Sequence, residues 1–282
     1  MQYTGIIGNP LGHSLSPVFQ QAAFDHMEIE VSYELLPTEP SALENRVNSL
    51  RSPEFLGANV TIPYKTDVIP LLDDIDGEAV LIGAVNTIAN QNGKLTGYNT
   101  DSLGFMKSLS NDAPYSLGSK HVLVVGAGGS ARAVLTGVLK EAPSRVVIAN
   151  RSIDRAMALK REIGTEYDQI IDVIALDDID EHLGEGTFDL VVNCTPMGMK
   201  GTTNEKYFPP ILKYIGPNTV VHDLVYNPRE TPLISNAKNY SNLVFNGLEM
   251  LIQQGAASFK IWTGNEAPIE IMREAVQEKL YN

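Results

Sequence analysis

The chain has 282 residues, of which 43% are hydrophobic and 20% are charged, a composition typical of one large or two moderate globular domains. Its net charge is −13 and no run of Lys and Arg forms a basic stripe, so we expect neither nucleic acid nor an anionic membrane as a partner. The single cysteine, Cys194, excludes an internal disulfide. Because the chain shows no signal-peptide pattern and no apolar stretch of membrane length, we expect a cytoplasmic protein.

Strand-like and helix-like segments alternate along the chain, which predicts an α/β fold with largely parallel sheets. In the first third, strands are predicted at residues 5–8, 31–36 and 55–61, and helices around 17–27 and 41–50. The segments 84–89 and 94–98 flank Gln91-Asn92-Gly93, which is typical of a hairpin turn. A helix is then predicted from Asp101, followed by a loop over residues 111–120.

Polar residues follow several of these predicted strands. Ser14 and Ser16 precede Pro17, which suits the first turn of a helix. Ser16 alone could be an N-cap, but a second serine two residues earlier is more than capping requires. Lys65 is predicted at a helix start, where its charge opposes the helix dipole, so it is either solvated or functional. Asp101 could simply cap a helix that begins at Ser102.

The sequence Gly126-Ala-Gly-Gly-Ser-Ala131 follows the apolar run 122–125 and leads into a predicted helix over 131–140. This strand–turn–helix setting is the one in which G-x-G-x-x-A binds a dinucleotide. Gly126 permits the tight turn, Gly128 lets the backbone approach the pyrophosphate, and Ala131 lets the helix pack on the strand. The predicted cofactor-binding residues here are Gly126, Ala127, Gly128, Gly129, Ser130 and Ala131.

The next predicted strand, 145–149, ends in Asn150-Arg151-Ser152, with Arg155 one helical turn further on. An NAD site usually has Asp or Glu at this position, whereas an Arg suits a 2′-phosphate because its planar fork binds phosphate through two hydrogen bonds. The sequence therefore predicts NADP as the cofactor. Asp154 is a competing feature that could reach the ribose, although it lies on the following helix.

Further strands are predicted at 170–175, 189–193, 219–223 and 243–245, which extend a Rossmann-type sheet. We therefore expect a substrate-binding domain over residues 1–110 and an NADP-binding domain over 111–246. Residues 247–282 are predicted to form two helices, broken near Gly264 and Pro268, that return to the first domain.

Taken together, the motifs resemble those of shikimate dehydrogenase over nearly the whole chain and in the family's order. The resemblance rests on these segments: Ser14-Leu-Ser16-Pro17, Asn59-Val-Thr61-x-Pro-x-Lys65, Gly83-Ala-Val-Asn86-Thr87, Asn99-Thr-Asp101-x-x-Gly104, the two cofactor motifs, Asn193-Cys-Thr195-Pro-Met-Gly198, Asp223-Leu-Val-Tyr226-Asn-Pro228 and Gly247-Leu-x-Met-Leu-x-x-Gln254.

The resemblance implies reversible, NADPH-dependent reduction of 3-dehydroshikimate to shikimate, a step of aromatic amino-acid biosynthesis. It implies a catalytic pair, Lys65 and Asp101. The implied substrate-binding residues are Ser14, Ser16, Asn59, Thr61, Lys65, Asn86, Asp101, Gln254 and, nearby, Tyr226. The implied cofactor-binding residues beyond the glycine-rich turn are Asn150, Arg151, Ser152, Arg155, Thr195, Met197, Gly198 and Gly247, with Met197, Gly198 and Gly247 lining the nicotinamide.

The residue chemistry agrees with this reaction. When hydride adds to a ketone carbon, negative charge develops on the oxygen, which a cationic Lys65 can stabilise and protonate. Asp101 can orient the ammonium group and bind a hydroxyl. Cys194 is expected to be a small buried residue near the cofactor, and the five histidines, His13 among them, show no metal spacing. The acidic stretches 71–76 and 177–181 are expected to be solvated.

Three alternatives stay open from the sequence. A quinate or quinate/shikimate dehydrogenase has the same fold and more often uses NAD, which Arg151 disfavours. A non-catalytic, NADP-responsive regulator would have no need of Lys65 and Asp101 together. Methylene-tetrahydrofolate dehydrogenase has a related two-domain plan, but the substrate loops give no reason to prefer it. The expected working unit is a monomer or a homodimer.

Overall fold

The computed structural model describes residues 1–12, 14–112, 116–183 and 186–281. The chain divides into two compact units: residues 1–104 together with 251–282, and residues 105–250. Both divisions fall inside helices, the first inside α4 (Asp101–Asp112) and the second inside α9 (Leu248–Thr263). Each of these helices therefore has residues in both units. The predicted boundaries, 110 and 246, lie a few residues away at the ends of the same two helices. His13 lies outside the described residues.

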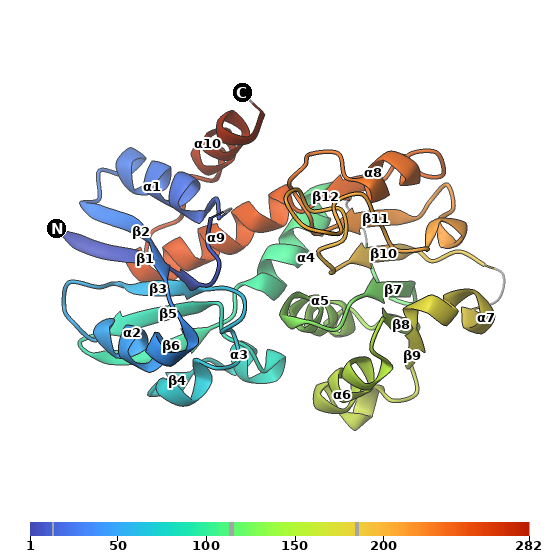
Figure 1. Cartoon of the computed structure of the whole chain (residues 1–282), viewed down its shortest axis with the longest axis horizontal. Coiled ribbons are helices and arrows are strands. Elements are labelled where there is room, and N and C mark those ends of the chain that lie inside the picture. The colour runs from blue at the N-terminus through green and yellow to red at the C-terminus, as the bar shows by residue number, and fades with distance from the viewer. Residues whose placement is uncertain (13, 113–115, 184–185, 282) are drawn as a thin grey trace. The chain divides into compact units, whose positions relative to one another are not determined.

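The first unit is built on a six-stranded mixed sheet (Figure 1). Its strand order is β2 (Val31–Pro37), β1 (Gln2–Gly8), β3 (Gly57–Val60), β5 (Thr87–Gln91), β6 (Lys94–Tyr98) and β4 (Asp74–Ile75). β1 runs parallel to both β2 and β3, whereas β5 runs antiparallel to β3 and β6. The predicted hairpin is confirmed, with Gln91 paired to Lys94.

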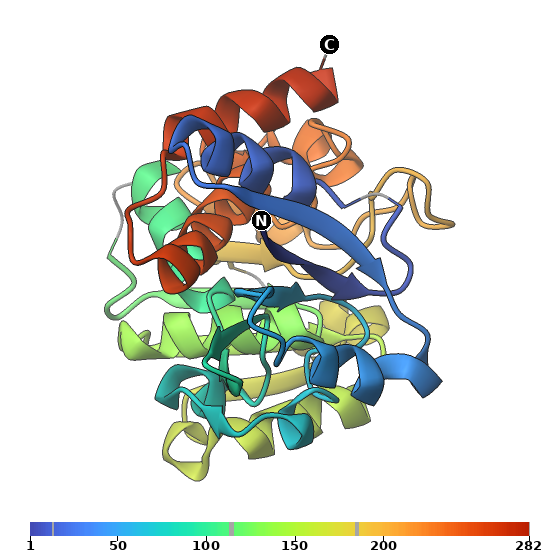
Figure 2. The same ribbon diagram turned by 90° about the vertical axis from the view of Figure 1, so that its left-hand side faces the viewer.

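Helices complete the first unit: α1 (Ser16–His26), α2 (Leu43–Ser49), α3 (Gly77–Ile82) and α10 (Ile269–Tyr281). The predicted C-terminal helical pair is confirmed as α9 and α10, which are separated by residues 264–268, where Gly264 has φ +73°. α10 lies beside α1 (Figure 2), so the end of the chain packs on its beginning. The predicted return of these helices to the first domain is therefore confirmed.

Two local predictions in this unit are wrong. The strand predicted at 55–61 is shorter, from Gly57 to Val60. Lys65 does not start a helix but lies in a run of turns over residues 62–68. The reason is that its carbonyl accepts a hydrogen bond from Val85 N at 2.7 Å, which ties this segment to the start of the β5 hairpin instead of to a helical turn.

The second unit contains a six-stranded sheet in which all paired strands are parallel. Its order is β12 (Val244–Asn246), β11 (Val220–Asp223), β10 (Leu190–Asn193), β7 (His121–Val125), β8 (Arg145–Asn150) and β9 (Ile171–Ala175). In chain order this is the Rossmann arrangement 3-2-1-4-5-6, read from the β9 edge. The helices are α5 (Gly129–Lys140), α6 (Ile153–Ile163), α7 (Ile179–Leu183) and α8 (Pro232–Ala237).

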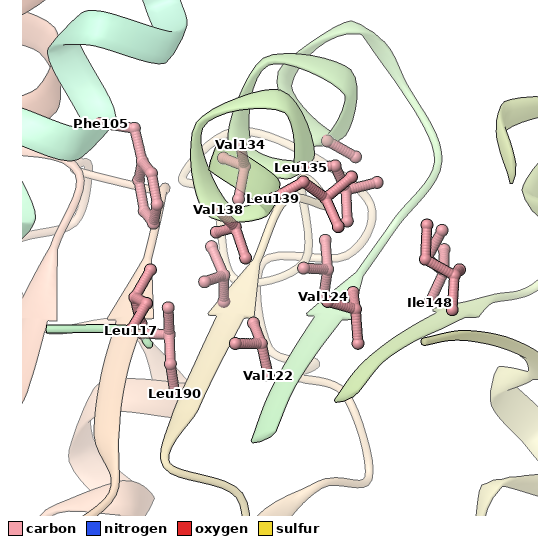
Figure 3. Packing of buried hydrophobic residues seen from close by; sticks show 14 of the residues in the cluster. Phe105, Leu117, Val122, Val124, Val134, Leu135, Val138, Leu139, Ile148 and Leu190 are labelled. Atoms are coloured by element: carbon pink, nitrogen blue, oxygen red, sulfur yellow. The ribbon is translucent and has the colours of Figure 1, made fainter. Parts of the chain in front are cut away.

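Continuous apolar strands explain this sheet, because both of its faces are covered. On one face, Val122 and Val124 of β7 pack with Val134 and Val138 of α5 (Figure 3), all fully buried. A second buried set, which includes the fully buried Leu123, lies on the other face. Each such side chain contributes about 1.5–3 kcal/mol on full burial. In the described ranges of the chain, no helix is long and apolar enough to cross a membrane.

Candidate active site

An ion pair between Lys65 and Asp101 lies in the first unit. The Lys65 Nζ is 2.5 Å from Asp101 Oδ2, and the two side chains are only 17% and 8% exposed. Asp101 is the first residue of α4, yet its carboxylate does not cap the helix; instead its backbone N–H donates to Asn99 Oδ1 at 3.0 Å. The simple capping interpretation of Asp101 is therefore wrong, and its carboxylate is committed to Lys65.

Asn86 orients this carboxylate. Its Nδ2 donates to Asp101 Oδ1 at 2.7 Å and to Thr100 Oγ1 at 2.9 Å. Its Oδ1 accepts from Thr100 N and from Thr87 Oγ1, both at 2.9 Å. An amide has two N–H donors and one acceptor oxygen, and all of them are used here. The two oxygens of Asp101 are thus held by a cation on one side and an amide on the other.

The network continues to Asn59 on β3, which is 5% exposed. Its Oδ1 accepts from the Tyr33 hydroxyl at 2.7 Å, and its Nδ2 lies 3.0 Å from Ser258 Oγ and 3.1 Å from Thr87 Oγ1. The structure therefore brings together four residues predicted from the sequence, Lys65, Asp101, Asn86 and Asn59.

Four further members of this network were not predicted as site residues: Tyr33, Thr87, Thr100 and Ser258. Thr87 and Thr100 adjoin Asn86 and Asp101 in the sequence, so the motifs pointed toward them. Ser258 lies four residues after Gln254 and hence on the same face of α9, which was a usable signal.

Four more predicted substrate residues, Ser14, Ser16, Thr61 and Gln254, also lie in the first unit. The helix α1 begins at Ser16, and the Ser14 hydroxyl accepts from Ser16 N at 3.4 Å, so Ser16 is not the N-cap. Thr61 follows β3, and its N–H donates to Ile7 O. Gln254 lies on α9, where its Nε2 donates to Leu251 O at 2.7 Å.

α9 approaches α4 closely in this unit. A Cβ on Gly104 would lie 2.7 Å from the Cβ of Gln254 and 2.8 Å from its backbone nitrogen. Only a glycine allows this approach. Gln254 therefore lies against Gly104, the α4 residue that comes three positions after Asp101.

Tyr226 belongs to the second unit, where burial raises the pKa of its hydroxyl and keeps it protonated at neutral pH.

The glycine-rich turn of the second unit has the geometry expected for phosphate binding. Gly126 has φ +113°, a conformation that favours glycine. Gly128 is the N-cap of α5, and a Cβ built on it meets no protein atom within 4 Å. The first turn of α5 carries no acidic side chain, while Ala131 is fully buried. The helix N-terminus therefore offers free N–H groups and a positive dipole end to an anion.

Arg151 and Arg155 lie at the end of β8 and the start of α6, and both side chains are exposed. Neither guanidinium forms an ion pair with any residue in the described part of the chain. The turn between them and the strand is held by Asn150, whose Nδ2 donates to Ser152 O at 2.8 Å. Two cations without protein partners fit a 2′-phosphate. Asp154 is also exposed, in the first turn of α6.

A buried carboxylate organises the loops after β10 and β11. Asp223 accepts from Asn193 Nδ2 at 2.9 Å, from Val225 N at 3.1 Å and from Thr231 Oγ1 at 2.6 Å. Burial raises the pKa of Asp223, and these hydrogen bonds oppose the rise. Asn193 in turn accepts from Thr195 N and Oγ1 at 3.0 and 2.6 Å. These contacts fix the position of Thr195, one of the predicted cofactor-binding residues.

The other predicted cofactor-binding residues near this segment are Met197, Gly198 and Gly247, and the backbone is closely packed around them. Met197 N donates to Thr195 Oγ1 at 3.3 Å, and Gly198 has φ +86°. A Cβ on Gly247 would lie only 2.0 Å from Leu224 O. Cys194 is half-buried and not fully buried as predicted. Desolvation still raises the pKa of its thiol, which is therefore protonated at neutral pH and unsuited to act as a nucleophile. Among the described residues, no group of His, Cys, Asp and Glu is arranged to hold a metal ion.

Comparison with known proteins agrees with these sites. The pattern of the shikimate dehydrogenase substrate-binding domain matches residues 6–88, that of shikimate/quinate 5-dehydrogenase matches 108–207, and that of the shikimate 5′-dehydrogenase C-terminal domain matches 247–277. The chain is 39% identical to the shikimate dehydrogenase (NADP(+)) of Methanopyrus kandleri over 280 residues, which cover 98% of this chain and 95% of that protein.

Solved structures give the same result. A shikimate dehydrogenase crystallised with NADP+ is 37% identical, with a TM-score of 0.89 over 100% of this chain and 96% of its own. The Thermus thermophilus shikimate 5-dehydrogenase in complex with NADP(H) and shikimate is 33% identical, with a TM-score of 0.84 over 99% of both chains. The chain belongs to the shikimate dehydrogenase family.

Proposed function

We propose that this protein is an NADP-dependent shikimate dehydrogenase that catalyses the reversible reduction of 3-dehydroshikimate to shikimate, a step of the shikimate pathway to chorismate and the aromatic amino acids. The observation that carries the proposal is the Lys65–Asp101 pair, held by Asn86 within a network of hydroxyl and amide side chains. Such groups suit a small acid with several hydroxyls, because a site built to hydrogen-bond a hydroxyl rejects analogues that lack it. The 39% identity to an NADP-dependent relative over nearly the full length supports it.

In this mechanism, NADPH supplies the hydride that adds to the ketone carbon. The Lys65 ammonium lies against the ketone oxygen, stabilises the developing negative charge and delivers the proton, directly or through a water. Asp101 fixes the direction of the ammonium through the 2.5 Å contact. Each Asp101 oxygen keeps a second lone pair, with which it accepts a hydrogen bond from a substrate hydroxyl. Ser14, Ser16, Asn59, Thr61 and Gln254 supply the remaining polar contacts.

The second unit holds the cofactor. The N-terminus of α5 binds the pyrophosphate, because Gly128 leaves its approach open. Arg151 and Arg155 bind the 2′-phosphate, which explains why both are exposed and make no ion pair within the described ranges. This arrangement favours NADP over NAD. Asp154, in the first turn of α6, is the residue that could bind the ribose of NAD.

The test is an assay of four pairs, shikimate or quinate with NADP or NAD, followed by the absorbance of the reduced nicotinamide. Fast reduction with shikimate and NADP alone is the expected result. A preference for quinate or for NAD would retain the fold and overturn the specificity. Absence of turnover with every pair, together with NADP binding in calorimetry, would favour a non-catalytic regulator.

Two further features of the proposal concern the setting of the enzyme. All the predicted catalytic and substrate residues except Tyr226 lie in one unit of one chain, which supports a monomer or a homodimer as the working form. Cys194 is a free cysteine, which supports a cytoplasmic location.

A further inference from the structure

The amide of Asn59 is held from both sides, and on each side one of the residues that hold it, Tyr33 or Ser258, lies outside the substrate motifs. On one side lies Tyr33, a buried residue of β2 whose hydroxyl donates to Asn59 Oδ1 at 2.7 Å. Burial raises the pKa of Tyr33, and a hydrogen bond with the Ser16 side chain opposes this rise. The phenol is therefore a neutral O–H donor at physiological pH.

On the other side, three acceptors face the Asn59 Nδ2. They are Ser258 Oγ at 3.0 Å, Thr87 Oγ1 at 3.1 Å and Asn86 O at 3.2 Å. Ser258 is anchored in its own helix by donating to Gln254 O at 3.1 Å. A carbonyl oxygen only accepts hydrogen bonds, so a flipped amide would place Asn59 Oδ1 against Asn86 O. The amide is thereby restricted to one orientation.

This orientation decides what Asn59 can offer a ligand. Its two N–H donors are engaged by the hydroxyl acceptors and by the Asn86 carbonyl, while its oxygen accepts one hydrogen bond, from Tyr33. One lone pair on the oxygen therefore remains. Asn59 can accept a hydrogen bond from a ligand hydroxyl but has no spare donor for a carbonyl or ether oxygen.

We propose that Tyr33 and Ser258 are positioning residues that fix the amide of Asn59 as an acceptor, so that it selects a hydroxyl group of the substrate. This inference deepens the proposed function and rests on it for the identity of the substrate. Tyr33 and Ser258 act through Asn59 and do not touch the reacting atoms.

The first test compares Tyr33→Phe and Ser258→Ala with the unaltered enzyme. Each variant removes one hydroxyl and leaves the shape of the side chain nearly unchanged. Loss of the neutral hydrogen bond that the removed hydroxyl makes to Asn59 should raise the KM for shikimate about three- to tenfold in each variant, with kcat and the KM for NADP unchanged. Ser258→Ala serves as the second variant if Tyr33→Phe folds poorly.

The matched control is Tyr214→Phe in the cofactor-binding unit. Tyr214 is 1% exposed, and its hydroxyl donates to Ile179 O at 3.0 Å, so the control also removes a buried phenol hydrogen bond. It should lower the melting temperature, as Tyr33→Phe does, but leave the KM for shikimate unchanged. An equal rise in KM in Tyr33→Phe and the control would show a general effect of lost stability and would overturn the proposal.

A double-mutant cycle tests whether Tyr33 acts through Asn59. In the Asn59→Ala background, Tyr33→Phe should raise the KM for shikimate no further. If Tyr33→Phe raises the KM by the same factor with and without the Asn59 amide, the positioning role is wrong.

A substrate-free readout separates this inference from the proposed function. In protein labelled with ¹⁵N-asparagine, the side-chain NH₂ signals of Asn59 are assigned as those that vanish in Asn59→Ala. Tyr33→Phe and Ser258→Ala should both shift these signals, whether or not the enzyme turns over shikimate. Unshifted signals would overturn the positioning role, whereas shifted signals in an enzyme inactive on shikimate would overturn only the proposed substrate.

Discussion

Removal of Arg151 should weaken the preference for NADP over NAD about tenfold. A charge-assisted hydrogen bond contributes about 1.5–3 kcal/mol. Because Arg151 and Arg155 are exposed and their charges are screened by salt, the lower value applies, which corresponds to about tenfold in affinity. Arg151→Ala should therefore raise the KM for NADP about tenfold, and the double variant with Arg155→Ala about a hundredfold if the two contacts are independent.

The assay measures initial rates at saturating shikimate while NADP or NAD is varied. The KM for NAD should not change, since NAD lacks the 2′-phosphate. Arg161→Ala is the control, because it removes the same charge from an exposed position near the other end of α6. Equal losses with both cofactors, or a loss in the control as large as in Arg151→Ala, would refute the assignment of Arg151 to the 2′-phosphate.

Three further outcomes are expected. Lys65→Ala should lower kcat about 10²–10⁴-fold with little change in the dissociation constant of shikimate, and surviving turnover with collapsed binding would exclude the catalytic role. The Arg51 hydrogen bond lowers the pKa of Asp73 below its ordinary 3.8, so its stabilisation is present above about pH 4 and lost as pH falls through the lowered pKa. Asp73→Asn should thus lower the melting temperature near pH 7, and this difference in thermal unfolding should shrink steadily as the pH is lowered below about 4; a difference that does not shrink would contradict the prediction. Gly247→Ala should lower the free energy of unfolding in urea by about 1–3 kcal/mol, because the added Cβ would lie 2.0 Å from a backbone carbonyl oxygen. Gly77→Ala is the control and should lower it less, because a Cβ at that position meets no atom within 4 Å.

The sequence predicted the second unit well because its strands are short, continuous apolar runs buried on both faces. It did not predict β4 or α3. β4 has only two residues, Asp74 and Ile75, too few to show an alternation. α3 has six residues, also too few for a helical period, although Asp76 caps its start and Gly83 ends it in the left-handed conformation. Asp76 and Gly83 were the features of the sequence from which α3 could have been predicted.

The site was predictable where the motif residues contact one another and unpredictable where partners are distant in sequence. Lys65, Asn86 and Asp101 lie in recognisable motifs, and they meet in the structure. Ser258 meets Asn59 from 199 residues away, a contact that depends on how α9 packs on the sheet. No local pattern of apolar and polar residues encodes such a packing.

The first unit is formed by two segments, residues 1–104 and 251–282, which lie on either side of the second unit in the sequence, and this sets an order for its assembly on the ribosome. Residues 105–250 are complete before residues 251–282 have been made. Until those residues emerge, Asn59 and Thr87 lack the Ser258 hydroxyl, and Ile88 lacks the indole of Trp262, which donates to its carbonyl at 2.9 Å. The substrate-binding unit therefore begins synthesis first and finishes folding last, so a chain that stops early carries a finished nucleotide-binding sheet but no assembled site for the reaction.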